Sequence, residues 1–581
     1  MTALEFVSRA AALAAVVGMS AWVAHICLRR RPDVVTTIIN LSFWIVPVSV
    51  LAAATGQFWK SFALGTALVF VLQRLHWLKW KYLADTLTVI DFRMVMNRAN
   101  WLVLHLYPYI AVFIVLCMMG LALSWIFMPD VEALDWPARG AALLLAAILV
   151  AFDIRFRHRH EFDPFGFNSY GHFANLLFSA SSLRYQPPRV KGDGQLFRER
   201  AATLPHRTIR RGSRPPDIVV WLQESATDPR IFDVPGASLP VLRMHEPDAW
   251  TREHGWLRVP TWGGSTWLSE FALLTGLTHR DFGAAGQGVY YTVTPHLRYS
   301  LPRLLRNHGY RSVVLFPVEK SFYNAESAYN DLGFDEVLNP LDFPEWQNKS
   351  LATTVVEDQD LITYALKILS RTSTEPLFLF MLSMIQHGPY DASHEVSHGL
   401  ERSALDRATA GRVSEWLSRM ERLSLDTVAF EEQLQQSARK TVFAYFGDHQ
   451  PNFQGVVPFT SLLQEPRFLT RYTIKGNGGG VDIATDGPEQ GLDLCFLGAR
   501  LLDHAGVPAN ELFAANAAMR QLCGGSLVGC RDTALVESYR AHLYHDLQAA
   551  KLSNTPESAN EPAHMGSLPS LATRRRPKAG A

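Results

Sequence analysis

The chain has 581 residues, a formal net charge of +1 and 48% hydrophobic residues. This length exceeds that of a single domain, and the near-zero charge gives no reason to expect nucleic acid as a partner. Five cysteines are too few for a disulfide scaffold. Apolar residues are concentrated in the first 155 positions, whereas the remainder has an ordinary globular composition.

Residues 1–155 predict an N-terminal α-helical transmembrane domain of about five spans. The apolar runs lie at about 10–28, 35–54, 61–76, 102–128 and 138–153. The fifth run is the shortest, and it either crosses the membrane or lies along the interface. Most tryptophans of this region fall near the ends of runs, as in the aromatic belts of membrane proteins, but Trp44 lies in the middle of the second run.

The basic residues of this region are compatible with two orientations. Arginines and lysines follow the first, third and fifth runs, as at Arg29, Lys79 and Arg155. Counted with five spans, they place the rest of the chain in the cytoplasm, and counted with four spans they place it outside. The stretch from Arg74 to Tyr82 also alternates basic with aromatic and aliphatic residues, which is typical of an interfacial segment.

The second part of the chain predicts a mostly parallel, doubly wound α/β domain at 215–550, after a connector at 156–214. Strand-like apolar runs alternate there with helical patterns. The predicted strands are 217–222, 312–317, 376–383 and 441–446, and the predicted helices are 298–308, 356–371 and 404–436. Residues 551–581 are rich in Ser, Pro, Glu, Ala and Arg, so we expect a disordered tail.

Three segments of this domain carry groups suited to chemistry. Glu224 follows the first strand, where open α/β sheets bind ligands, or it belongs to a helix N-terminus, where acids are also favoured. Thr266 lies between a Gly-Gly-Ser turn and an apolar helical pattern, so it is either an ordinary N-cap or a hydroxyl beside an anion site. His387 follows another strand and either contacts phosphate or bonds to the backbone of its loop.

A fourth segment supplies the pair Asp448 and His449, directly after the strand 441–446. A carboxylate oxygen and an imidazole nitrogen are common metal ligands. With Glu224 and the hydroxyl of Thr266 they form a mixed set suited to Mn²⁺ or Zn²⁺, and a bound ion would lower the pKa of that hydroxyl. Only one carboxylate follows the first strand, which favours a site for a single metal ion.

Taken in order, these motifs resemble the lipoteichoic acid synthase family, which are phosphoglycerol transferases of the alkaline phosphatase and sulfatase superfamily. The matching motifs are Glu224, Thr266 with Ser-Glu-Phe three residues on, His387-Gly-Pro-Tyr and Gly-Asp448-His449. The resemblance implies that Glu224, Thr266, Asp448 and His449 bind one Mn²⁺, with Zn²⁺ or Mg²⁺ as alternatives. It also implies that Thr266 is the nucleophile that becomes phosphorylated and that His387 contacts the substrate.

The same resemblance implies a membrane-bound transferase. It would move a phosphoglycerol or related phosphoalcohol group from a phospholipid to a glycan or lipid acceptor through a phosphothreonine intermediate. Tyr323 lies in the segment that matches the family's head-group contacts, and we expect it to bind substrate. Ala325 replaces an arginine of that segment, which leaves glycerol and ethanolamine both open as head groups.

The alternatives on this scaffold are a phosphoethanolamine transferase and a phosphodiesterase or sulfatase-like hydrolase. The Pro-x-Arg pattern that sulfatases need after their modified residue does not follow Ser265. A third alternative, a non-enzymatic membrane sensor with a degenerate α/β domain, is disfavoured by the intact set of Glu, Thr, Asp and His.

The resemblance places the catalytic domain on the outer, periplasmic side of a bacterial cytoplasmic membrane, and we expect that orientation. Export would allow a disulfide between Cys523 and Cys530, with two free thiols as the alternative. The expected partners are the membrane, a phospholipid donor and a glycan or lipid acceptor.

Overall fold

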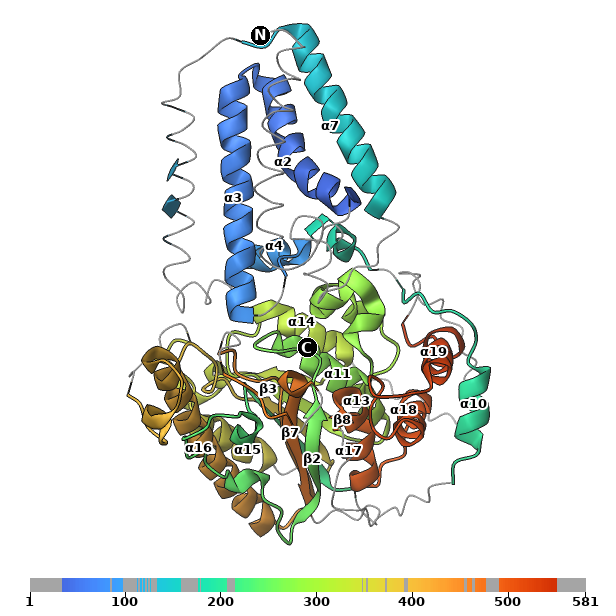
Figure 1. Cartoon of the computed structure of the whole chain (residues 1–581). Coiled ribbons are helices and arrows are strands. Elements are labelled where there is room, and N and C mark those ends of the chain that lie inside the picture. Colours follow the sequence, from blue (N-terminus) through green and yellow to red (C-terminus); the bar gives the residue numbers. More distant parts are fainter. Residues whose placement is uncertain are drawn as a thin grey trace, which may run out of the picture.

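The computed structural model describes residues 34–83, 86–97, 133–157, 176–205 and 215–550, together with isolated positions between 112 and 126. Short gaps within these ranges are 178, 186, 347, 352–353, 371–373, 391–394, 454–456, 462–464 and 477–490. The predicted span at 10–28, most of the one at 102–128 and the predicted tail lie outside the described residues. Figure 1 shows the N-terminal helices standing together on one side of a larger α/β domain.

An eight-stranded sheet organises the described part of the α/β domain, in the order β4-β3-β5-β1-β6-β7-β2-β8. The strands are β1 (Asp217–Gln223), β2 (Thr251–Arg258), β3 (Arg311–Leu315), β4 (Glu336–Leu338), β5 (Leu377–Leu382), β6 (Thr441–Gly447), β7 (Leu469–Gly476) and β8 (Leu492–Asp493). The first five strands in this order, β4, β3, β5, β1 and β6, run parallel to one another. Strand β7 is antiparallel to both β6 and β2. The prediction of a mostly parallel α/β domain is confirmed.

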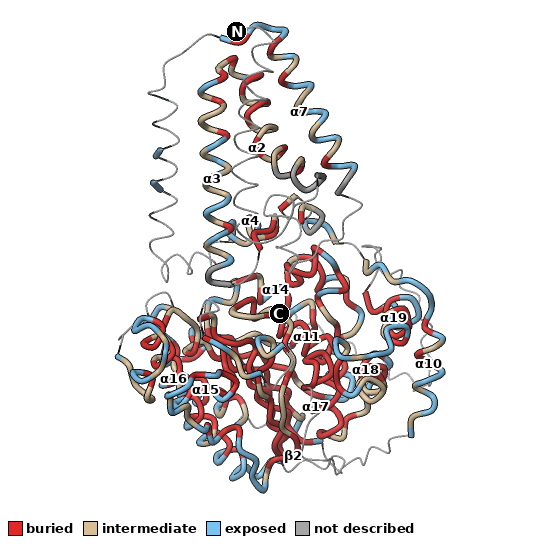
Figure 2. The backbone as a smooth tube through the Cα atoms, in the orientation of Figure 1, coloured by how far each residue is buried: buried red, intermediate tan, exposed pale blue. Residues whose placement is uncertain are grey.

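Helices cover both faces of the sheet. Side chains alternate along a strand, so Val220 and Leu222 of β1 point to one face, and Val219 and Trp221 to the other. The first face packs against α11 (Thr266–Thr275), α13 (Leu301–Asn307), α14 (Ala325–Leu332), α17 (Leu497–Ala505), α18 (Glu511–Leu522) and α19 (Thr533–Ala541). The second packs against α15 (Asp358–Leu369) and α16 (Arg407–Gln436). The sheet is therefore a buried middle layer, as Figure 2 shows.

Three long helices form the N-terminal part: α2 (Val34–Thr55), α3 (Phe58–Leu83) and α7 (Trp136–Arg157). Ser42 Oγ of α2 donates a hydrogen bond to Asp153 Oδ2 of α7 at 2.6 Å. Trp44 Nε1 donates to Thr66 Oγ1 of α3 at 3.0 Å, and the indole is only 4% exposed. Trp44 therefore fills the contact between two helices, which explains its place in the middle of an apolar run.

Two of the described helical stretches, Phe58–Trp80 and Trp136–Arg155, are long and apolar enough to cross a membrane. The apolar part of α2, Leu41–Thr55, is shorter. The prediction of about five spans is thus not confirmed, because two of its runs lie outside the described residues and α2 falls short. The fifth run belongs to a helix of 22 residues and is longer than its sequence pattern indicated.

A short helix, α4 (Val89–Met96), lies beside the lower part of α3, close to the α/β domain (Figure 1). Its first turn is capped by Asp91, whose Oδ2 accepts from the backbone N–H of Thr88 at 2.6 Å. Lys79 Nζ, near the end of α3, donates to the same carboxylate oxygen at 2.9 Å. The two helices are therefore tied together where the N-terminal part meets the α/β domain.

Candidate active site

The C-terminal ends of three adjacent parallel strands bring three candidate site segments together. Glu224 follows β1, His387 lies in the loop after β5, and Asp448 follows β6. Strands β1 and β6 pair in a register that sets Gln223 opposite Gly447, so Glu224 and Asp448 are neighbours. Glu224 lies in a turn rather than at the start of a helix, so the N-cap alternative does not apply to it.

Thr266 enters the site from the first residue of α11. The turn before it places Gly263 (φ 74°) and Ser265 (φ 66°, ψ 44°) in left-handed conformations. Ser265 is the N-cap residue but its side chain makes no capping bond, and the hydroxyl of Thr266 instead donates to Glu224 Oε2 at 3.1 Å. The ordinary N-cap alternative therefore does not describe Thr266. Its hydroxyl faces the carboxylates from the positive end of a helix.

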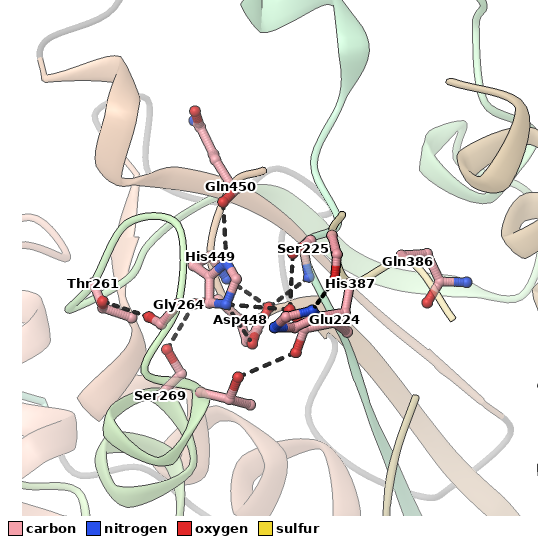
Figure 3. Close-up of polar contacts among 12 residues, drawn as sticks. Glu224, Ser225, Thr261, Gly264, Ser269, Gln386, His387, Asp448, His449 and Gln450 are labelled. Atoms are coloured by element: carbon pink, nitrogen blue, oxygen red, sulfur yellow. Dashed lines mark hydrogen bonds and ion pairs between the residues drawn. The ribbon is translucent and has the colours of Figure 1, made fainter. Parts of the chain in front are cut away.

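Glu224, Asp448 and His449 form a compact buried cluster, drawn in Figure 3, in which one ligand atom of each lies within 4.8 Å of the others. His449 Nε2 lies 3.3 Å from both Glu224 Oε1 and Asp448 Oδ2. All three residues are at most 1% exposed. Ser225 supports both carboxylates, since its N–H donates to Asp448 Oδ1 and its hydroxyl to Glu224 Oε1, each at 2.8 Å.

The donor set fits a divalent cation. His449 Nδ1 bonds to the carbonyl of Gln450 at 3.0 Å, which places the proton on Nδ1 and leaves the lone pair of Nε2 directed at the carboxylates. His449 Nε2 and Asp448 Oδ2 are both buried and have no hydrogen-bond partner among the described residues. Buried acceptors that face one another without a donor are unfavourable unless a cation lies between them.

The electrostatics of the carboxylates of Glu224 and Asp448 also favour a bound cation. Burial and the negative charge of Glu224 raise the pKa of Asp448 well above its ordinary value. Burial also acts to raise the pKa of Glu224, but His449, His387 and two hydroxyl hydrogen bonds outweigh it, so this pKa is lowered. A bound divalent cation would supply the positive charge that lets both carboxylates stay ionised.

His387 lies half-buried near Glu224, as Figure 3 shows. Its Nδ1 lies 2.5 Å from the carbonyl oxygen of Gly388. The hydrogen bond from His387 to the backbone of its own loop, which was one of the two alternatives from the sequence, is therefore present. This bond places the proton on Nδ1, and Nε2 is then the nitrogen that remains for a substrate.

Tyr323 lies beside the site but its hydroxyl faces inward. It donates to Glu270 Oε1 at 2.7 Å, and Tyr290 and Tyr329 donate to the same buried carboxylate. Burial raises the pKa of Glu270 to about 7, against the effect of the three phenols. The ring of Tyr323 packs against Trp267 with centroids 5.5 Å apart. The structure thus places Tyr323 against Trp267, the residue that follows Thr266, while Ala325 lies fully buried in the core.

Helix α16 braces the site loops from outside the cluster. Arg419 donates to the backbone carbonyls of Ile385 (3.1 Å), His387 (2.8 Å) and Pro389 (3.4 Å). One turn earlier, Trp416 Nε1 donates to the carbonyl of Ser225 at 3.1 Å. A single helix face therefore fixes the loop after β5 and the loop after β1.

Sequence reasoning missed these supports. Arg419 and Trp416 act on backbone carbonyls far away in the sequence, and such contacts leave no motif. Ser269 belonged to a recognised motif but had no assigned role. Its hydroxyl donates to the carbonyl of Asp448 at 2.6 Å and so joins α11 to the end of β6.

Several known proteins are similar to this chain in sequence. The sulfatase family profile matches residues 216–490. An uncharacterized protein of Haemophilus influenzae is 31% identical over 515 residues, which cover 86% of this chain and 92% of that protein. The Rhizobium meliloti capsular polysaccharide biosynthesis protein RkpI is 25% identical over 256 residues, which cover 43% of this chain and 44% of that protein.

Among solved structures, the Streptococcus pyogenes phosphoglycerol transferase GacH in complex with sn-glycerol-1-phosphate is 18% identical. The match covers 64% of this chain and all of that one, with a TM-score of 0.49. Residues 216–490 of the chain therefore form a sulfatase-family domain, and the family resemblance seen in the motifs is confirmed at that level.

The cluster predicts one divalent transition-metal ion per chain. Metal analysis of the purified full chain should give close to one equivalent, and Asp448→Ala with His449→Ala should remove it, because two of the three buried ligands are lost. Replacing Glu421, which pairs with His398 at 3.0 Å on the protein surface, by Gln is the matched control and should leave the metal content unchanged. Full metal content in the double variant would disprove this assignment.

The hydrogen bonds from Arg419 to the loop after β5 predict that Arg419→Gln lowers kcat/KM by roughly tenfold to a hundredfold, since a displaced loop misplaces His387. Metal content should not change, because Arg419 contacts none of the cluster. Arg422→Gln, one turn further along α16 and 55% exposed, is the control and should retain full activity. Equal losses in both variants, or loss of metal from Arg419→Gln, would show that the helix acts in some other way.

Proposed function

We propose that this chain is a membrane-bound, metal-dependent transferase that moves a phosphoglycerol or related phosphoalcohol group from a phospholipid to a glycan or lipid acceptor. The reaction passes through a phosphothreonine on Thr266. The observation that carries the proposal is the hydroxyl of Thr266, 3.1 Å from Glu224 Oε2, at the N-terminus of α11 and next to a buried cluster of metal ligands.

In the first step, Thr266 Oγ1 attacks the phosphorus of the donor lipid. A new Oγ1–P bond forms, the bond from phosphorus to the diacylglycerol oxygen breaks, and the proton of Thr266 ends on diacylglycerol. The N–H groups at the start of α11 face the phosphoryl oxygens, because a helix N-terminus favours anions. Glu224 orients the Thr266 hydroxyl before the attack.

In the second step, an acceptor hydroxyl attacks the phosphothreonine, the Oγ1–P bond breaks, and Thr266 regains a proton from the acceptor. His387 presents Nε2 to the transferred group and is suited to hold or move this proton. Glu224, Asp448, His449 and Thr266 would hold one ion, Mn²⁺ or else Zn²⁺ or Mg²⁺, which would stabilise charge on the phosphoryl oxygens and lower the pKa of the nucleophile.

The head group remains the point on which the alternatives differ. Phosphoethanolamine transfer or hydrolysis would use the same nucleophile and the same ligands. Tyr323 is proposed to contact the head group through its ring, since its hydroxyl is engaged by Glu270. A glycan acceptor accords with the name of the capsular polysaccharide relative.

The proposed location is the outer side of a bacterial cytoplasmic membrane, with residues 1–155 as a multi-pass transmembrane domain, 156–214 as connector and 215–550 as catalytic domain. Two described helices of sufficient length and apolarity support membrane insertion. The disulfide between Cys523 and Cys530 accords with an oxidising compartment.

Mass spectrometry of the tryptic peptide that contains Thr266 tests the reaction directly. The full chain incubated with phosphatidylglycerol and phosphatidylethanolamine should carry an adduct on Thr266, and its mass distinguishes phosphoglycerol from phosphoethanolamine. Thr266→Ala should lose the adduct and at least about a thousandfold in turnover, because no other hydroxyl replaces the nucleophile.

Ser265→Ala is the matched control for this substitution. It removes the neighbouring hydroxyl, which makes no capping bond. Ser and Ala both carry a Cβ, so the left-handed backbone at position 265 costs about the same with either residue. We expect turnover within a few-fold of the unmodified chain and a normal metal content in both variants. Loss of turnover in Ser265→Ala with retention in Thr266→Ala would show that Ser265, and not Thr266, is the nucleophile.

Sidedness is tested by fusing reporters after Gln548. A reporter that is active only after export should work there, and one that is active only in the cytoplasm should not. We expect this orientation in spite of the basic residues after the third apolar run, because arginines and lysines in an interfacial segment do not fix topology in the way that loop residues do. Activity of the cytoplasmic reporter, or protection of residues 215–550 from protease added outside, would reverse the orientation.

A further inference from the structure

One face of α4 is apolar and exposed. Phe92, Val95 and Met96 are 41%, 61% and 86% exposed, and their spacing of three and four residues places them on the same side of the helix. The opposite side is packed, since Ile90 is only 1% exposed. An apolar stripe of this kind is unfavourable in water and favourable against lipid.

If α3 crosses the membrane as proposed, the position of α4 puts this face near the membrane surface. Lys79, four residues before the end of the long apolar helix α3, is bonded to Asp91 of α4. The last turns of α3 carry Trp77 and Trp80, which are 49% and 37% exposed. Exposed tryptophans at the end of an apolar helix are typical of the head-group region.

Both ends of α4 contact segments that hold Trp267, the residue next to Thr266. At one end Ile90 packs so closely on Gly288 that a Cβ there would lie 2.5 Å from Ile90 Cγ1. The neighbouring Gln287 accepts the Nε1–H of Trp267 through its carbonyl at 3.0 Å.

At the other end, Asn97 Nδ2 donates to the carbonyl of Ser321 at 2.6 Å. Two residues further on, the ring of Tyr323 packs against Trp267. Between the two ends, Arg93 lies over the ring of Tyr291, 5.5 Å from its centroid. The helix thus lies along the side of the site formed by Trp267 and Tyr323.

We infer that the exposed face of α4 is the docking surface for the acyl chains of the phospholipid donor. The occupant is a two-chain phospholipid whose head group reaches past Tyr323 toward Thr266 while its chains lie on Phe92, Val95 and Met96. This inference rests on the proposed function. It adds that α4, rather than the catalytic cluster, distinguishes a lipid donor from a soluble phosphodiester with the same head group.

The test uses the full chain in vesicles and two donors for each head group, with dioleoyl or with dihexanoyl chains. The variant replaces Phe92, Val95 and Met96 together by Ser. The apparent KM for the dioleoyl donor should rise about tenfold or more, since burial of one large apolar side chain is worth roughly a factor of ten. Turnover of the dihexanoyl donor should stay unchanged. Leu425→Ser, which removes an apolar side chain that is 68% exposed on α16, is the control and should change neither value.

A second measurement does not depend on turnover. A phospholipid with a photoreactive group in one acyl chain should label residues 92–96 of the unmodified chain. Equal losses on the long-chain and short-chain donors, no loss on either, or absence of label on α4 would each overturn the inference. Labelling of α4 without transfer of either head group would contradict the proposed function and leave the docking surface standing.

Discussion

The constraint on which this protein depends is the convergence of buried hydrogen-bond acceptors at one edge of its sheet. Glu224, Asp448 and the lone pair of His449 face a common buried point. Such a cluster is destabilising by itself and becomes favourable only around a cation. The parallel strands, the left-handed turn at Ser265 and the N-terminus of α11 all position groups around this point, so catalysis and folding share the same electrostatic requirement.

Loops at a sheet edge are mobile unless other elements hold them, and here the holding groups come from the two helical layers. From one layer, Arg419 and Trp416 of α16 bind the backbone of the loops after β5 and β1. From the other, Ser269 of α11 binds the backbone at the end of β6. The side chains proposed to bind substrate and metal are therefore not used for these connections, which are made to backbone carbonyl oxygens.

Much of this arrangement could be predicted because it follows from strand ends. The apolar runs of β1, β3, β5 and β6 are visible in the sequence, and so are the polar residues that follow three of them. Strands β2 and β7 were missed because their buried charges are satisfied only by distant partners. Glu253 of β2, for example, accepts from Arg500 and His504, more than two hundred residues away. Arg419 was missed for the same reason, since bonds to carbonyls depend on tertiary structure and not on residue type.

The pairing of β1 with β6 also sets the moment at which the site can exist during biogenesis. Ser225 and Asp448 are hydrogen-bonded neighbours in space but lie 223 positions apart in the chain. The ligand set cannot form until the chain has emerged at least as far as His449, so an emerging chain cannot acquire an ion early. If the domain is exported unfolded, as its proposed location requires, the ion is taken from the compartment where folding finishes. The metal supply of that compartment would then decide which cation the proposed site carries.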